Sequence, residues 1–410
     1  MRIGHPDRGV AAAVMTAAAL LFVPLSTARA QVAAPGVEVP DERKRLNARV
    51  FDRVWHVVER DYYDPSLNGV DWEAARDRFR PEAVAAVDDG ALYTTINAML
   101  DLLDDAHAQA SSPAVTRRQD AAGRERPVIG ITVARGDDGV YRVEAVREGS
   151  AAADAGVRPG WRLAGGWTPD HDVIAGQVVR IAFLDEAGAP QARELTPRIM
   201  PPVPTFVADR SRPGVLVLTV RAFEPGLGRW MGAELAGLGP DVDVILDFRG
   251  NPGGRLYEAE AVLGCFLPAD VPWAWRTART GARRLMTTSA PCGELGAPLE
   301  NDLAVLVGPS SRSAAELTPA ALQESGRGLV VGTKTPGAVL ISMDADLPDG
   351  GRLTLSRADF VTVSGVRLEK RGVTPDVVVA AEAGPDAALA AAIAALADPV
   401  DTAGSPPAPN

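Results

Sequence analysis

Two turns rich in glycine and serine hold the residue types of this sequence best suited to nucleophilic chemistry. The first spans residues 247–254 (DFRGNPGG) and the second residues 310–316 (SSRSAAE). Glycine N–H groups that point out of a tight turn can bind an oxygen that becomes anionic in a transition state. A serine at the start of a helix lies where the helix N–H groups favour developing negative charge. The two turns therefore predict a nucleophile and the electrophilic groups that would assist it.

Each turn has a simpler alternative when it is taken alone. Gly253 and Gly254 can merely close a tight turn between a strand and a helix. A serine in front of a helix is most often an N-cap. Because both turns occur, in order, within one region of the chain, the catalytic interpretation is favoured over either alternative.

The elements around both turns predict one α/β domain. Short, β-branched apolar runs at 242–246 and 303–307 are typical of buried strands in a mostly parallel sheet. Helical patterns begin at about Leu256 and Ala314, so both turns would lie at strand-to-helix corners of one sheet. We expect this domain to extend over residues 203–398.

The first thirty residues have the features of a signal peptide. Arg2 and Arg8 give a positive start, an apolar stretch follows, and the sequence Ala-Arg-Ala ending at Ala30 fits the small-x-small cleavage rule. The apolar stretch is too short and too rich in alanine for a stable membrane span. We therefore expect cleavage near Ala30 and a soluble mature protein that is periplasmic or secreted.

The composition is that of a globular protein, with 46% hydrophobic and 23% charged residues among 410. The net charge of −11 argues against nucleic acid or an anionic membrane as the main partner. Cys265 and Cys292 could form one disulfide in an oxidising compartment or remain as buried thiols. Nothing in the sequence indicates a cofactor or a metal site, and it leaves the oligomeric state open.

A small helical domain is expected at residues 41–110, after a linker at 31–40. Apolar residues recur at helical spacing in its first part, a second helix opens at Asp71, and a third covers residues 91–103. The residues that follow, 110–126, are rich in serine, arginine and glutamine. We expect them to form a mobile linker.

Three histidines remain in the mature chain. His56 lies in the middle of the first helix, where a structural histidine is the better interpretation. His171 lies in a loop of proline and aspartate and is expected to be solvated. His107 follows a helix end in a polar turn, where its imidazole could reach a cleft and act as a general base near neutral pH. The alternative for His107 is helix capping or a surface position.

A β-rich module is predicted at residues 127–200. Strand patterns at 127–133 and 140–146 flank a turn, and a short alanine helix leads into a Gly-Val-x-Pro-Gly turn. This order resembles a PDZ domain, although Trp161 stands where the PDZ pattern usually continues with an acidic residue. The resemblance implies that a peptide tail would add as a strand beside Ile129, Gly130, Ile131 and Thr132. A purely structural β-module is the alternative.

Taken together, the motifs resemble the C-terminal-processing, or tail-specific, serine peptidase family. The resemblance rests on Asp247-x-Arg249-x-Asn251-x-Gly253-Gly254, on Ser311-x-Ser313-Ala314-x-Glu316 and on Gly372-Val373-x-Pro375-Asp376. It implies an α/β multidomain protein whose peptidase domain has the ClpP/crotonase type of fold. It also implies Ser313 as the nucleophile, with an oxyanion hole made by the N–H of Ala314 and one N–H from Gly253 or Gly254.

One position departs from the pattern of this family. The usual motif places the lysine of a Ser-Lys dyad directly after the glycine that matches Gly337, whereas this chain has Ala338. An alanine cannot accept a proton, so the standard dyad is absent. Lys334 is out of register, and a solvated loop lysine is the better interpretation.

The stretch from Thr335 to Val339 is similar instead to the branch that includes the tricorn core protease and the retinoid-binding-protein modules. In that branch a histidine from the helical segment serves the serine, and a late glutamate assists. The resemblance implies His107 as the base and Glu369 as the assisting carboxylate. Tricorn has a serine next to its histidine, and Ala106 lacks that hydroxyl.

The sequence therefore predicts an exported serine endopeptidase. It would hydrolyse unfolded or tail-exposed polypeptides through an acyl-enzyme on Ser313, with His107 as the base. Two alternatives stay open: a catalytically inactive protein that binds peptides or other ligands on the same fold, and a Ser-Lys peptidase that uses Lys334. Residues 399–410 are expected to form a disordered tail.

Overall fold

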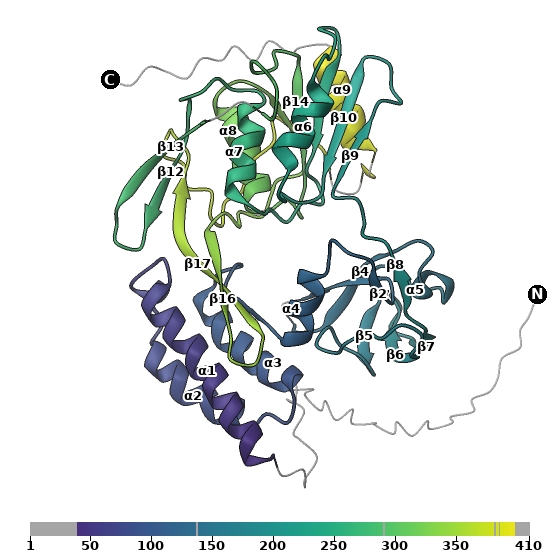
Figure 1. Cartoon of the computed structure of the whole chain (residues 1–410), viewed down its shortest axis with the longest axis vertical. Helices are drawn as coiled ribbons and strands as arrows, with labels where there is room; N and C mark the ends of the chain where they lie inside the picture. Colours follow the sequence, from purple (N-terminus) through teal and green to yellow (C-terminus); the bar gives the residue numbers. More distant parts are fainter. Residues whose placement is uncertain (1–38, 137, 290–291, 381–382, 385, 398–410) are drawn as a thin grey trace, which may run out of the picture. The chain divides into compact units, whose positions relative to one another are not determined.

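The computed structural model describes residues 39–136, 138–289, 292–380, 383–384 and 386–397. The predicted signal peptide, most of the linker after it and the predicted tail lie outside the described residues. Within the described ranges, no helix combines the length and the apolar character that crossing a bilayer requires. The chain is a mixed α/β protein with several sheets, as predicted (Figure 1).

A six-stranded sheet carries both glycine- and serine-rich turns. Its strand order is β18-β15-β14-β11-β10-β9, and all neighbouring strands are parallel except β9 and β10. The strands are β9 (Phe206–Asp209), β10 (Val215–Val220), β11 (Asp243–Asp247), β14 (Leu303–Val307), β15 (Leu329–Gly332) and β18 (Val377–Val378). The two apolar runs are thus confirmed as central strands of a mostly parallel sheet.

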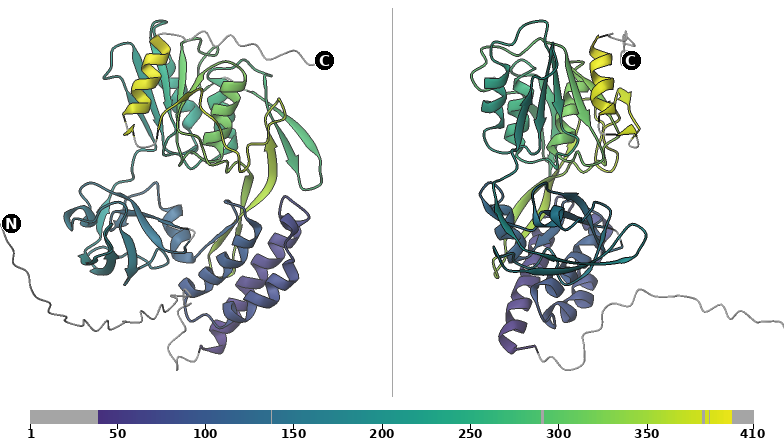
Figure 2. Two further views of the ribbon diagram at one scale, coloured as in Figure 1. Left: turned by 180° about the vertical axis from the view of Figure 1, so that it is seen from behind. Right: turned by 90° about the vertical axis from the view of Figure 1, so that its right-hand side faces the viewer.

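Helices cover both faces of this sheet. On one face pack α6 (Leu227–Leu235), α7 (Leu256–Gly264) and α8 (Ala314–Glu324), and on the other packs α9 (Ala387–Ala397) (Figure 2). Side chains alternate between the faces of a strand, so Leu246 joins the core under α6, α7 and α8 while Ile245 joins the core under α9. Burial on both faces explains why the strand sequences are apolar throughout.

The helical segment shares its core with a β-hairpin far away in the sequence. Its helices are α1 (Asp41–Asp61), α2 (Trp72–Val84) and α3 (Asp89–Leu100), with 3-10 turns at Leu67–Gly69 and Asp101–Leu103. Leu347, Leu353 and Leu355 of the hairpin formed by β16 (Ile341–Asp346) and β17 (Arg352–Val361) belong to the same buried cluster as these helices. The packing of this helical segment therefore depends on residues that follow Ser313 in the sequence.

Strand β1 (Gln109–Ser111) extends this connection through the backbone. It pairs antiparallel with β17, and Ala110 faces Leu353 in the register. The same sheet continues through β12 (Pro272–Ala278) and β13 (Arg283–Thr287). The chain immediately after His107 is thus hydrogen-bonded to a strand of the C-terminal part.

The prediction of a mobile linker at 110–126 is wrong. This stretch contains the end of β1, the helix α4 (Pro113–Asp120) and the beginning of β2 (Arg126–Val128). Pro113 occupies the first turn of α4, where its missing N–H has no intrahelical role. Ala114 and Thr116 are buried, so a helix that is polar in composition still has an inward face.

The β-rich module contains a five-stranded antiparallel sheet in the order β3-β4-β5-β6-β7. Its elements are β3 (Ile131–Arg135), β4 (Tyr141–Val146), α5 (Ala151–Asp154), β5 (Arg162–Gly165), β6 (Val179–Leu184) and β7 (Pro190–Leu195), while β2 pairs with β8 (Arg198–Met200). The single strand predicted at 127–133 is divided at Gly130. The φ of Gly130 is 92°, and a Cβ there would lie 2.0 Å from the Ser150 side chain.

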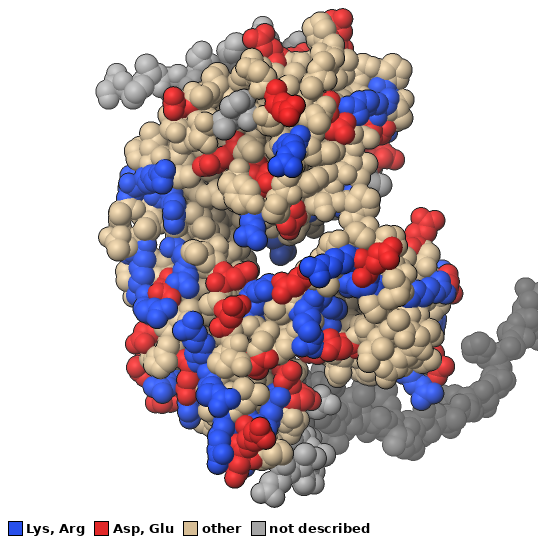
Figure 3. Space-filling model, in the orientation of Figure 1, with Lys and Arg blue, Asp and Glu red and all other residues tan. Residues whose placement is uncertain are grey.

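Cys265 and Cys292 form a disulfide, which was one of the two alternatives. Both cysteines are buried, and the bond joins the end of α7 to the segment that precedes β14. On the face shown in Figure 3, Lys and Arg side chains are intermixed with Asp and Glu side chains. That face therefore offers no continuous basic surface for a nucleic-acid backbone.

Candidate active site

Ser313 stands at the corner between β14 and α8, as predicted. It is the N-cap residue of α8, with φ 55° and ψ −119°, a conformation that costs a non-glycine residue about 1–3 kcal/mol. Its backbone N–H donates to the carbonyl of Ala338 (2.7 Å) and to Oε2 of Glu316 (3.2 Å), and these bonds hold the corner in place. Strained strand-to-helix corners of this kind expose a nucleophilic side chain.

The glycine turn after β11 packs directly against Ser313. A Cβ added to Gly253 would lie 2.7 Å from the Cβ of Ser313 and 2.9 Å from the carbonyl oxygen of Arg312. The N–H of Arg312 also donates to the carbonyl of Asn251 (3.0 Å). Because β11 and β14 are adjacent parallel strands, their carboxyl ends meet at one edge of the sheet. The structure thus brings together the two turns that the sequence singled out.

The backbone N–H groups of Gly254 and Ala314, which follow Gly253 and Ser313 in the sequence, donate no hydrogen bond within the described residues. The N–H of Gly253, in contrast, donates to Oδ1 of Asn251 (2.8 Å). The side chain of Asn251 is buried, and its Nδ2 donates to the carbonyl of Val220 (2.9 Å), so the amide is held at both ends. The two glycines that the sequence left as alternatives therefore differ, and the free donor belongs to Gly254.

The substitution Gly253→Ala should damage this junction strongly. The new Cβ would overlap Ser313 and the backbone of Arg312, and the φ of 103° at Gly253 strains any residue with a Cβ. We expect a loss of stability of about 1–3 kcal/mol and a fall in kcat of about 10²-fold or more, because the nucleophile must shift. Thermal melting and hydrolysis of an unfolded protein substrate would measure both.

Gly250→Ala is the matched control for this substitution. Gly250 lies in the same turn, and a Cβ there would meet no atom within 4 Å. We expect this variant to keep the stability and activity of the parent chain. Full activity of Gly253→Ala, or equal losses in both variants, would contradict the packing described here.

The buried carboxylate of Glu316 holds the loop that carries Ala338 against the serine corner. Its Oε1 accepts hydrogen bonds from Oγ1 of Thr335 (2.6 Å) and from the N–H of Gly337 (2.7 Å). Its Oε2 accepts from the N–H groups of Ala338 (2.8 Å) and Ser313. Burial raises the pKa of Glu316, and these donors oppose the rise by stabilising the anion. The position of the missing dyad lysine is therefore occupied by a buried alanine in a tightly fixed loop.

The remaining basic candidates are at the surface. The side chain of Lys334 is exposed and has no ion-pair partner in the described part of the chain, which agrees with a solvated loop lysine. The side chain of His56 is 61% exposed, and its Nδ1 lies 3.7 Å from Oε2 of Glu59. The prediction of a structural histidine is therefore wrong. His171 is exposed, and its Nδ1 accepts a hydrogen bond from the N–H of Thr168 (3.3 Å).

His107 lies in the turn before β1, and its side chain is only 15% exposed. Burial lowers the pKa of His107 below its ordinary value; the negative charge of Asp105 opposes this shift, and the positive charge of Arg312 adds to it. Arg312 directly precedes Ser313 in the sequence. No hydrogen bond joins the His107 ring to Ser313 within the described residues.

The turn that carries His107 is linked to the serine corner through another loop. Asp104 forms an ion pair with Lys370, and the N–H of Lys370 donates to the carbonyl of Gly337 (2.7 Å). Gly337 belongs to the loop held by Glu316. These contacts, with the pairing of β1 and β17, position a residue of the helical segment near a corner that lies about two hundred residues further along the chain.

Glu369 is buried in the same region. Its Oε2 accepts a hydrogen bond from the N–H of Val339 (2.9 Å). Burial raises the pKa of Glu369, and the nearby charge of Asp105 contributes to the rise. Within the described residues its carboxylate forms no hydrogen bond with the ring of His107. The structure thus brings Glu369 to the loop beside Ala338 without a direct contact to the imidazole.

Sequence reasoning missed Asp105. Its side chain is 1% exposed, its Oδ1 accepts the backbone N–H of His107 (2.9 Å), and the same oxygen lies 3.9 Å from Nδ1 of that histidine. An acidic residue two positions before a histidine, at the end of an apolar helix, was the signal that could have found it.

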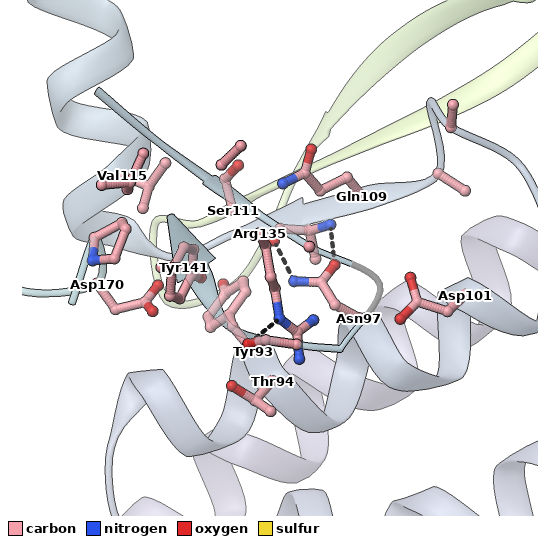
Figure 4. Close-up of a pocket in the computed structure, with 18 of the residues that line it drawn as sticks. Tyr93, Thr94, Asn97, Asp101, Gln109, Ser111, Val115, Arg135, Tyr141 and Asp170 are labelled. Atoms are coloured by element: carbon pink, nitrogen blue, oxygen red, sulfur yellow. Dashed lines mark hydrogen bonds between the residues drawn. The ribbon is translucent and has the colours of Figure 1, made fainter. Parts of the chain in front are cut away.

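A cavity of about 760 Å³ opens beside the turn at residues 104–108 and the strands β1 and β3 (Figure 4). The side-chain amide of Asn97 bonds both the N–H and the carbonyl of Ala110 (2.8 and 2.9 Å), as a neighbouring strand would. Arg135, at the end of β3, and Asp170 also line the cavity. The cavity is therefore bordered by polar groups and by two strands at sheet edges.

The residues predicted to bind a peptide occupy two kinds of position. Ile131 and Thr132 lie on β3, which is the edge strand of its sheet. Ile129 is buried in the core of the module, and Gly130 packs against Ser150. Of the four predicted residues, Ile131 and Thr132 thus lie on a strand at a sheet edge, to which an extended chain could add.

Two family models match the chain. Residues 215–379 match the Peptidase family S41 model, and residues 46–101 match the Tricorn protease C1 domain. The first match contains both turns of the serine corner, and the second covers the helices that precede His107.

Curated relatives match over most of the chain. The carboxyl-terminal-processing protease of Synechocystis sp. is 26% identical over 362 residues, which is 79% of this chain and 79% of the relative. The carboxyl-terminal-processing peptidase 3, chloroplastic, of Arabidopsis thaliana is 24% identical over 406 residues, 92% of this chain and 77% of the relative.

Solved structures show the same fold. The photosystem II D1 C-terminal processing protease superposes with a TM-score of 0.57 at 24% identity, over 83% of this chain and 94% of that chain. A putative S41 protease from Bacteroides fragilis gives a TM-score of 0.51 at 18% identity, over 85% of this chain and 98% of that chain.

Proposed function

Because this chain belongs to the Peptidase family S41 and is a serine-type peptidase, we propose that it cleaves peptide bonds through an acyl-enzyme on Ser313, with His107 as the base. The observation that carries the proposal is the packing of Gly253 against Ser313, beside the free N–H groups of Gly254 and Ala314. A hydroxyl next to two unused backbone donors suits attack on a carbonyl whose oxygen becomes an anion.

The chemistry follows from the positions of these groups. The oxygen of Ser313 attacks the carbonyl carbon of the substrate while His107 takes the hydroxyl proton. The oxyanion of the tetrahedral intermediate accepts hydrogen bonds from the N–H groups of Ala314 and Gly254. The intermediate collapses, and the leaving amine takes the proton from His107. Water then attacks the acyl ester with His107 again as base, which releases the carboxylic acid and restores Ser313.

His107 is preferred over Lys334 as the base. Its lowered pKa keeps the imidazole neutral near pH 7, so it can accept a proton. Lys334 is exposed, and its side chain has no hydrogen bond with Ser313 within the described residues. The absence of a hydrogen bond between His107 and Ser313 does not weigh against this role, because catalytic hydrogen bonds commonly tighten only when substrate binds.

The substrates that fit the proposal are polypeptides with a free, extended C-terminal segment. The relatives named carboxyl-terminal-processing proteases support this class. The β-rich module at 127–200 would act as a PDZ-like domain, with the substrate added as a strand along β3. The cavity beside β1 and β3 reaches the histidine turn at Asp105, Ala106 and Ala108, and a segment added to β3 would run along it. We place the mature protein in the periplasm or outside the cell, since the disulfide needs an oxidising compartment.

Labelling with a serine-directed phosphonate ester tests this function. The reagent reacts with a serine hydroxyl only when a base activates it and donors receive the negative oxygen. We expect one phosphonate per folded chain, found by mass spectrometry on the peptide that contains Ser313, and none after denaturation. Slower labelling of His107→Ala than of the parent chain would support His107 as the base. Labelling of Lys334→Ala at the parental rate would argue against a Ser-Lys dyad.

A binding protein without activity is the second candidate, favoured by Ala338 in place of the dyad lysine. Such a protein would leave Ser313 unlabelled and would bind an unfolded polypeptide without cleaving it. The phosphonate experiment therefore decides between the two candidates.

A further inference from the structure

Two buried polar atoms beside the serine corner are left without a partner. They are Oδ2 of Asp105 and Nδ1 of His107, and neither has a hydrogen-bond partner among the described residues. Buried polar atoms are nearly always satisfied, so an orphaned pair requires a functional explanation. One of these atoms is an acceptor and the other can carry a proton, which makes them natural partners for each other.

The geometry of the turn brings these two side chains together. Oδ1 of Asp105 accepts the backbone N–H of His107 (2.9 Å), and this bond fixes the carboxylate two residues before the imidazole. Nδ1 lies 3.9 Å from that same oxygen. This separation exceeds a hydrogen bond by about 1 Å, so the bond requires the imidazole or the carboxylate to turn. Because both residues belong to one turn, their relation is kept when the turn moves.

The surroundings offer the carboxylate of Asp105 one other donor, the phenol of Tyr62. The side chain of Asp105 is 1% exposed, so solvent does not satisfy it. Burial, the charge of Asp105 and a hydrogen bond to that carboxylate raise the pKa of the Tyr62 phenol, so Tyr62 and His107 are the two groups that can donate to Asp105. The charged or titratable groups around the Asp105–His107 pair include Tyr62, Tyr63, Arg312, Glu369 and the ion pair of Asp104 with Lys370.

We propose that Asp105 is the positioning residue for His107: its carboxylate accepts the Nδ1–H of the imidazole, which leaves Nε2 to take the proton of Ser313. This inference rests on the proposed function. A carboxylate in this position selects the tautomer in which the free lone pair points at the nucleophile, and it stabilises the imidazolium that forms. The turn Asp-Ala-His thus carries both the base and the group that orients it.

Glu369 is less suited to this task. Its Oε2 is already engaged by the N–H of Val339 (2.9 Å), a bond that fixes the loop beside Ala338. Burial raises the pKa of Glu369, and the charge of Asp105 adds to the rise, so the two carboxylates lie in one region of the structure. We assign Glu369 to the support of that loop and Asp105 to the imidazole.

The tautomer of His107 tests the proposal without any assay of activity. The full chain carrying Ser313→Ala is labelled with ¹⁵N-histidine; the chain has four histidines, so His107 is assigned with His107→Gln. We expect the neutral imidazole of His107 to carry its proton on Nδ1. A proton on Nε2 in this parent chain would overturn the proposal, and this result needs no substitution of Asp105.

Variants then identify the carboxylate responsible. In Asp105→Asn we expect the proton to move to Nε2, because an amide N–H can donate to Nδ1, and we expect His107 to titrate at lower pH because a charge that raises its pKa is gone. Glu369→Gln should leave the tautomer unchanged, as should Asp77→Asn, which changes an exposed aspartate of α2. An unchanged tautomer in Asp105→Asn, or a tautomer change only in Glu369→Gln, would overturn the assignment.

Kinetics of the active chain give the second readout. We expect Asp105→Asn to lower kcat by about 10²–10⁴-fold with KM little changed, as loss of the orienting carboxylate does in serine peptidases. A purely structural role would lower the melting temperature without changing the tautomer. Should Ser313→Ala cleave as fast as the parent chain, the proposed function fails, and the tautomer still decides whether Asp105 binds the imidazole.

Discussion

Replacing Ser313 with alanine is expected to reduce kcat for an unfolded protein substrate by about 10⁶-fold, to the level left by the oxyanion hole and substrate binding. The substitution removes the hydroxyl proposed to form the acyl-enzyme, whereas the backbone donors of Ala314 and Gly254 stay in place. The fold should be retained, because the N–H of residue 313 keeps its bonds to Ala338 and Glu316, and only the capping contact of the hydroxyl with the N–H of Glu316 is lost. Discontinuous cleavage assays with mass-spectrometric detection of products can follow so slow a reaction.

Ser310→Ala is the matched control for this substitution. Ser310 lies in the same turn and is exposed, so its hydroxyl has no part in the packing of the corner. We expect this variant to cleave at the parental rate. Unchanged cleavage by a purified Ser313→Ala variant would refute the nucleophile and with it the proposed mechanism.

The second large effect is expected at His107. His107→Ala removes the group that takes the serine proton, and we expect kcat to fall by about 10²–10⁴-fold, the usual contribution of a positioned base. Stability should change less, because within the described residues the ring has no hydrogen-bond partner outside its own turn. Initial rates against substrate concentration, with melting temperatures as a check on folding, would measure the effect.

The pH profile identifies the base independently of the size of that loss. Catalysis requires the unprotonated imidazole, so kcat/KM rises with pH through the pKa of His107 in the free enzyme. Burial and Arg312 lower this pKa, and Asp105 only partly opposes them. The acid limb of the profile should therefore lie below the ordinary histidine value of about 6.5, and it should be lost in His107→Ala.

Two variants serve as controls for the base. His56→Ala changes an exposed histidine of α1, and Lys334→Ala changes an exposed lysine of the loop before Ala338. Both should keep the parental rate and acid limb. A loss of activity confined to Lys334→Ala, with His107→Ala fully active, would show that the chain uses a Ser-Lys centre after all.

Local sequence was sufficient for the parts of the fold that depend on neighbouring residues. The strand at 303–307 was predicted with the bounds that the structure has, and the strand predicted at 242–246 lies at 243–247, because apolar periodicity and turn residues act within about ten positions. The stretch at 110–126 was misjudged for the same reason. Its polar composition suggested a linker, while the burial of Ala114 and Thr116 depends on the sheet against which α4 packs.

The sequence by itself determined the two corners of the site, since Gly253 and Ser313 each follow a strand whose parallel pairing brings its carboxyl end to the same edge. Only the tertiary structure decided the rest. It showed that the N–H of Gly253 is taken by Asn251 while that of Gly254 is free, and that Asp105 lies buried beside His107. The physical reason is that the pairing of distant strands sets hydrogen-bond partners and burial. The register of β1 on β17 cannot be predicted from the sequence of either segment alone.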